Sequence, residues 1–139
     1  MNTVFRTLHV LLFVLTSASF LSAEDAAGPE AWPMFRGTPT GSGRSSVILQ
    51  LPLKEQWHRR FEGGAFTATP VINSNTIYLG DLDGHFMALS LNDGKTLWQF
   101  DSPDSGFPSA AAVSTNADYP LVVVGDDLGA IRCMNSNNG

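Results

Sequence analysis

The hydrophobic pattern from Trp57 onward is that of short β-strands. Brief runs of apolar and β-branched residues alternate with clusters of Gly, Asn and Asp, and no stretch repeats its apolar residues at helical spacing. Such runs favour strands, and the polar clusters favour tight turns between them. The sequence therefore predicts an all-β chain, with strands in one stretch at residues 68–72, 76–80, 86–91 and 97–100.

The same pattern returns further along the chain. A shift of 41 residues aligns Trp57 with Trp98, and a shift of 45 residues aligns Gly94 with Gly139, so one insertion of four residues falls near 116–120. A period of ~40 residues without a helix is typical of a four-stranded propeller blade. We predict a partial β-propeller of about two four-stranded antiparallel blades. The second blade has strands at 110–113, 121–124 and 130–134 and lacks its outer strand.

The first residues have the layout of a secretory signal peptide. Arg6 precedes an apolar run over 10–21, and Ser22-Ala23 offers a small-residue cleavage position. The run is about 12 residues, shorter than the ~20 that a membrane-spanning helix needs. We therefore predict export to the periplasm or the extracellular space, with no stable membrane insertion after cleavage. The expected organisation is a signal peptide at 1–23, a linker and aromatic lead-in at 24–53, and propeller repeats at 54–139.

The charge balance argues against nucleic acid as a partner. The chain carries a net charge of −5, and removing the signal peptide, which holds Arg6 and no acidic residue, makes it more negative. Phosphate binding needs a local positive potential. Arg59-Arg60 is the single adjacent basic pair, and we interpret it as a solvated strand edge.

Residues with reactive or metal-binding side chains are few and scattered. The single cysteine, Cys133, excludes an internal disulfide, and its alternating apolar run predicts a buried small hydrophobe. His58 and His85 have no second ligand at metal spacing, so we expect exposed strand residues. The acidic segment 80–84 is interpreted as a turn rather than a calcium loop. We assign no catalytic, cofactor-binding or metal-binding residue.

The segment from Ala88 to Trp98 resembles the tryptophan-docking motif of PQQ-type (pyrroloquinoline-quinone-like) β-propeller repeats. That motif has the form Ala-x-Asp-x-x-Thr-Gly-x-x-x-Trp, and Ala88, Gly94 and Trp98 match it. Ser90 stands where Asp is usual, and Asp93 stands where Thr is usual. The resemblance covers residues 32–139, and its second copy lies in register.

The resemblance implies a structural role for the motif. In this family the Trp ring lies between the Gly backbone of a neighbouring blade and the small Ala of its own blade. A glycine at that position allows the close approach because it has no Cβ atom. Carried over residue by residue, the expected docking set is Trp57, Ala88, Gly94, Trp98, Cys133 and Gly139.

Two functions are compatible with the resemblance. The first is a non-catalytic binding or scaffolding module whose partners are proteins or the remaining propeller blades. The second is the N-terminal piece of a quinoprotein dehydrogenase that holds PQQ and calcium in a closed ring. A ring needs four to eight blades, and we match none of the quinone or calcium ligands of that class. We therefore favour the binding module, in a truncated propeller with no cofactor.

Overall fold

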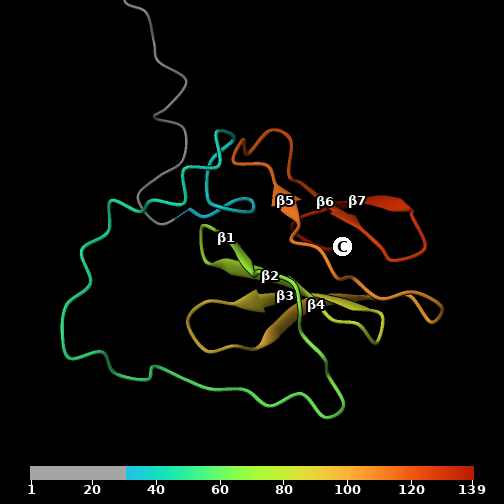
Figure 1. Cartoon of the computed structure of the whole chain (residues 1–139), viewed down its shortest axis with the longest axis horizontal. Helices are drawn as coiled ribbons and strands as arrows, with labels where there is room; N and C mark the ends of the chain where they lie inside the picture. The colour runs from blue at the N-terminus through green and yellow to red at the C-terminus, as the bar shows by residue number, and fades with distance from the viewer. Residues whose placement is uncertain (1–30) are drawn as a thin grey trace, which may run out of the picture.

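The computed structural model describes residues 31–139 and contains two stacked β-sheets (Figure 1). The expected signal peptide at 1–23 and the first part of the linker lie outside the described residues. No helix within 31–139 is long and apolar enough to cross a membrane. The all-β prediction is confirmed, with one sheet of four strands and one of three.

The first sheet is a complete four-stranded antiparallel meander. Its strands follow chain order, and each pairs with the next. They are β1 (Val71–Asn73), β2 (Thr76–Gly80), β3 (His85–Ser90) and β4 (Thr96–Asp101). β1 begins three residues later than expected because Pro70 has no N–H to donate to a ladder.

The second sheet repeats the first without its fourth strand. It consists of β5 (Ala112–Val113), β6 (Leu121–Gly125) and β7 (Ile131–Asn135), again antiparallel and in chain order. Each strand overlaps one of the segments that the sequence predicts.

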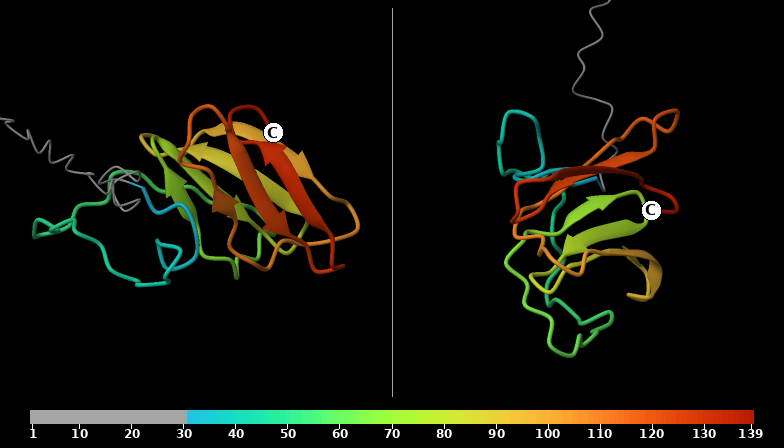
Figure 2. Two further views of the ribbon diagram at one scale, coloured as in Figure 1. Left: turned by 90° about the horizontal axis from the view of Figure 1, so that it is seen from above. Right: turned by 90° about the vertical axis from the view of Figure 1, so that its right-hand side faces the viewer.

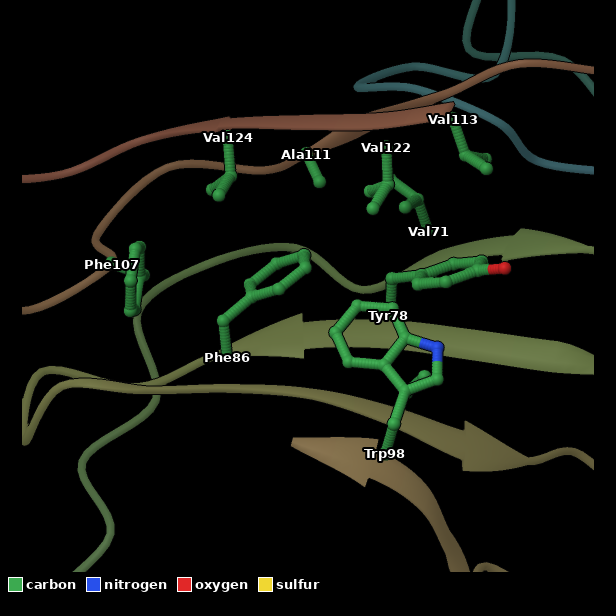
Figure 3. Packing of buried hydrophobic residues seen from close by; sticks show 10 residues of the cluster. Val71, Tyr78, Phe86, Trp98, Phe107, Ala111, Val113, Val122 and Val124 are labelled. Carbon is green, nitrogen blue, oxygen red and sulfur yellow. The ribbon is translucent and has the colours of Figure 1, made fainter. Parts of the chain in front are cut away.

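The core lies between the two sheets. Figure 3 shows aromatic side chains of the first sheet pointing toward valines of the second. Val122 and Val124 are buried, whereas Val123 between them is exposed, as expected for a strand with one covered face. Two views at right angles show the sheets as layers (Figure 2). The buried cluster consists of Val71, Tyr78, Phe86, Ala88, Trp98, Phe107, Ala111, Val113, Val122 and Val124.

The chain preceding each sheet contacts that sheet in the same way. The Leu82 N–H donates to the Ala65 carbonyl at 2.9 Å, and the Asp127 N–H donates to the Gly106 carbonyl at 3.1 Å. The acceptors are 41 residues apart and the donors 45 residues apart, which are the two repeat shifts of the sequence. Segment 54–66 therefore lies against the first sheet as 95–107 lies against the second.

One expected strand does not form. The sequence pattern predicts Trp57 and His58 on an outer strand, but residues 54–60 have no β-structure. A strand needs a ladder partner, and no neighbouring strand within residues 31–139 pairs with this segment. Trp57 and His58 therefore do not lie on a strand, although His58 is exposed as expected and the segment contacts the first sheet.

The aromatic lead-in joins the two sheets through its backbone. Trp32 and Ile72 exchange two backbone hydrogen bonds, at 2.7 and 2.8 Å, and the Val113 N–H donates to the Pro33 carbonyl at 2.8 Å. β1 and β5 are the first strands of their sheets, so the lead-in satisfies edge groups on both. It thereby fixes the first strands of the two sheets side by side.

Candidate functional site

The side chain of Trp98 lies in the interface between the two sheets. It is 8% exposed, and it pairs across the ladder with Ala88. Its indole N–H donates to the Ser136 carbonyl of the second repeat at 2.9 Å, and the Tyr78 hydroxyl donates to the same carbonyl at 3.1 Å. A Cβ atom added at Gly139 would lie 3.2 Å from the indole ring. The ring therefore lies between its own blade and the Gly139 backbone.

Trp57 makes two of these contacts one repeat earlier, the hydrogen bond to a carbonyl and the packing on a glycine. Its indole N–H donates to the Leu91 carbonyl at 2.9 Å, and a Cβ atom added at Gly94 would lie 2.7 Å from its ring. Gly94 has a φ of 68°, in the left-handed region that favours glycine. Arg59 adds a hydrogen bond to the Gly94 carbonyl at 2.9 Å.

Of the six residues expected to dock, the structure brings five together in two groups. One group holds Trp98, Ala88 and Gly139, and the other holds Trp57 and Gly94. Cys133 lies apart from both.

The expectation that Cys133 is buried is wrong, because its side chain is exposed. Cys133 lies opposite Val123 in the β6–β7 ladder, and directly opposed residues point to the same face of a sheet. That face points away from the first sheet, and Ile131 on it is 79% exposed. Alternation places Cys133 on an apolar face correctly, but it does not reveal which of the two faces another layer covers.

Asp81 and His85 form a hydrogen-bonded pair that sequence reasoning did not find. Asp81 Oδ2 lies 2.9 Å from His85 Nδ1, and Asp81 Oδ1 accepts the backbone N–H groups of Asp83 and His85. The hydrogen bond that the His85 imidazole donates to the Asp81 carboxylate raises the pKa of His85 above its ordinary value. His85 is a strand residue as expected, but its imidazole is only partly exposed and is hydrogen-bonded to Asp81. His58 is exposed, and its Nδ1 lies 3.1 Å from Glu55 Oε1.

This turn does not fit a calcium ion. Calcium takes six to eight oxygen ligands, and both carboxylate oxygens of the buried Asp81 are held by N–H groups of the turn and by the imidazole. Within residues 31–139, no group of three or more His, Cys, Asp or Glu side chains is arranged to hold a metal.

The second repeat carries a different polar cluster at the same place. Asp126, 45 residues after Asp81, accepts the Ala130 N–H at 2.7 Å, Arg132 at 2.8 Å and the Ser105 hydroxyl at 3.2 Å. The Ala130 N–H, with further help from Arg132 and Ser105, lowers the pKa of Asp126. Arg132 stands 45 residues after the buried Met87, and that substitution at a repeat position is the signal that could have found the cluster.

The described surface includes two small hollows. One, of about 130 Å³, lies beside His85 and is lined by residues that include Arg59, Glu62 and Gln99. The other, of about 190 Å³, lies between the β1–β2 turn and the longer β5–β6 connection. Pockets for drug-sized ligands occupy roughly 300–1,000 Å³, so neither hollow would enclose a tricyclic quinone.

Comparison with known proteins identifies the family. A family model, PQQ_2, described as the outer membrane protein assembly factor BamB, matches residues 37–139. The crystal structure of BamB from Moraxella catarrhalis is similar with a TM-score of 0.52 and 22% identity, over 60% of this chain and 25% of that chain. This chain therefore spans about a quarter of that protein. No curated protein matches. Since the family model covers most of its length, the chain belongs to the BamB-like PQQ-repeat family and forms part of a β-propeller.

Proposed function

We propose that this chain contributes one four-stranded blade and three strands of the next to an exported, non-catalytic PQQ-like propeller that acts as a binding or scaffolding module. The observation that carries the proposal is that the same aromatic groups join the repeats and the same carboxylates hold a turn within each repeat. The indole N–H groups of Trp57 and Trp98 donate to carbonyls of the following repeat, and the Asp81 and Asp126 carboxylates hold turns together. These groups support architecture rather than a reacting centre.

In this proposal the tryptophan-docking set holds successive blades together. Trp57 packs on Gly94, and Trp98 packs on Gly139 with Ala88 beneath it. Cys133 occupies in β7 the position that Ala88 occupies in β3. Because the small Ala88 side chain leaves room for the Trp98 ring, the small Cys133 side chain suits a further blade of the ring in the same way. The proposed partners are proteins or other propeller blades.

The place of action is the periplasm or the extracellular space. The signal-like sequence of residues 1–23 supports export. The matching family is described as an outer membrane protein assembly factor, which fits a protein that binds other exported proteins. Fold does not by itself give function, so the scaffold role rests on the contacts above and on this family description.

Cofactor titration and site-specific crosslinking test the proposal. The full chain is mixed with PQQ and Ca²⁺, and its absorbance spectrum and dye-linked alcohol oxidation are recorded. We expect no quinone band and no oxidation. A photo-crosslinking residue at the exposed Leu128 should form an adduct with another exported protein or blade segment, and the exposed Thr40 serves as a control position. Quinone binding or alcohol oxidation would overturn the proposal in favour of a dehydrogenase.

A further inference from the structure

We infer that the groove between the β1–β2 turn and the β5–β6 connection binds the main chain of an extended, uncharged polypeptide segment. The inference rests on the proposed binding function and assigns it a site. The groove has a volume of about 190 Å³, and its lining includes Asn73, Ser114, Thr115, Asn116 and Asn137.

The groove exists because the two repeats differ at this place. Between the first two strands of the first sheet lie residues 74–75, whereas the second sheet has residues 114–120 at the equivalent position. This connection contains the four-residue insertion that changes the repeat shift from 41 to 45. The tryptophan–glycine contact is kept in both repeats. A loop that departs from a repeated scaffold is where a binding function can be added without disturbing the core.

The longer connection is held in one conformation by its own hydrogen bonds. The Asn116 N–H donates to the Ser114 hydroxyl at 3.2 Å, and the Asp118 N–H donates to Asn116 Oδ1 at 2.9 Å. The Asn73 side-chain amide donates to the Ser114 carbonyl at 2.9 Å and joins the connection to the first sheet. A preformed groove loses less conformational entropy when a ligand binds.

The chemistry of the lining selects the ligand class. No residue that lines the groove is charged or aromatic. Asn73 is half-buried and Thr115 and Asn116 are exposed, so the side-chain donors and acceptors of these lining residues are accessible at the groove. A peptide group presents one donor and one acceptor, and it matches this lining without any charge. A carbohydrate commonly requires an aromatic face to stack on, and the groove offers none.

The size of the groove indicates that only part of the ligand lies inside it. A volume of about 190 Å³ is below the roughly 300 Å³ at which pockets enclose a drug-sized molecule. An extended segment that crosses the groove, with a few peptide units inside and the remainder outside, satisfies this limit. Because the lining has no charge to pair with, a charged side chain of the segment would be disfavoured at the groove, and we therefore expect an uncharged segment.

The test uses an end-blocked ten-residue peptide of alternating threonine and valine. Binding to the full chain is followed by fluorescence anisotropy and by NMR shifts of backbone amides. We expect shifts at 73–74 and 114–117. Asn116→Asp keeps the acceptor for the Asp118 N–H but removes the amide donor, and it should weaken binding about fivefold, as expected for one lost hydrogen bond. Asn92→Ala in the β3–β4 turn is the matched control and should bind unchanged.

A second variant replaces residues 115–120 with the Ser-Asn turn of the first repeat and should abolish the shifts while leaving the thermal midpoint within a few degrees. Shifts confined to other parts of the chain, or absence of binding, would overturn the groove assignment. Equal binding of a glutamate-rich or lysine-rich peptide, or preferential binding of a neutral oligosaccharide, would also overturn it. None of these outcomes affects the quinone and crosslinking results that test the proposed function.

Discussion

The indole ring of Trp98 lies against the backbone of Gly139, 41 residues further along the chain and in the next repeat. The contact crosses from the outer strand of one sheet to the turn after β7 of the other, and the Ser136 carbonyl anchors it by accepting the indole N–H. Trp57 makes the same contact with Gly94. One contact thus occurs twice at the spacing of the repeat, and in the proposed role it holds successive blades together.

Removing the Trp98 ring is expected to destabilise the chain strongly. Trp98→Ala deletes a buried aromatic side chain and its hydrogen bond, which costs about 3–5 kcal/mol of unfolding free energy. The neighbouring Leu97 is 55% exposed, so Leu97→Ala should change stability by no more than about 0.5 kcal/mol. Urea denaturation of the three proteins gives both values. A midpoint for Trp98→Ala equal to that of the unaltered chain would contradict the role of the ring.

A methyl group at Gly94 is expected to cost more than one at Gly129. Both glycines have positive φ, but an added Cβ at Gly94 meets the Trp57 ring at 2.7 Å, whereas one at Gly129 has nothing within 4 Å. Gly129→Ala therefore measures the backbone cost alone, about 1–2 kcal/mol, and Gly94→Ala adds a steric cost. Chemical denaturation compares the two variants. Equal losses of stability would show that Trp57 does not pack on Gly94.

The Asp81–His85 pair predicts a pH dependence of stability. The folded pKa of His85 is raised above its unfolded value, so its contribution is fully present below about pH 6.5 and is lost as the pH rises through the folded pKa. Asp81→Asn keeps an acceptor oxygen in the turn but removes the charge, and it should lower the pKa of His85. NMR titration of the imidazole measures this directly. An unchanged pKa in Asp81→Asn would contradict the pairing.

The repeat carried most of what the sequence could predict about the fold. Its two shifts placed the strands, and the family resemblance placed Trp98 beside Ala88 and Gly139. The failures have specific physical causes. Cys133 lies on a strand face that no other layer within residues 31–139 covers, and Trp57 lacks a ladder partner. The local alternation of apolar and polar residues predicts neither fact, because both depend on which strands lie nearby.

The polar features depended on contacts that spacing alone does not reveal. The sequence predicts Asp81 as a turn residue, which it is, but its second oxygen also holds His85 across the turn. The groove requires two connections from different sheets to meet, with Asn73 joined to Ser114. The insertion near 116–120 was visible in the sequence, whereas its position beside the first β-turn follows only from the stacking of the sheets.

The central claim is that Trp98 packs on Gly139 between successive repeats, and nuclear Overhauser spectroscopy of the full chain tests it most directly. The account predicts cross-peaks between the Trp98 indole protons and the Gly139 Hα protons, and a large ring-current shift of those Hα resonances that disappears in Trp98→Ala. Random-coil Hα shifts at Gly139, with no cross-peak to the indole, would contradict it.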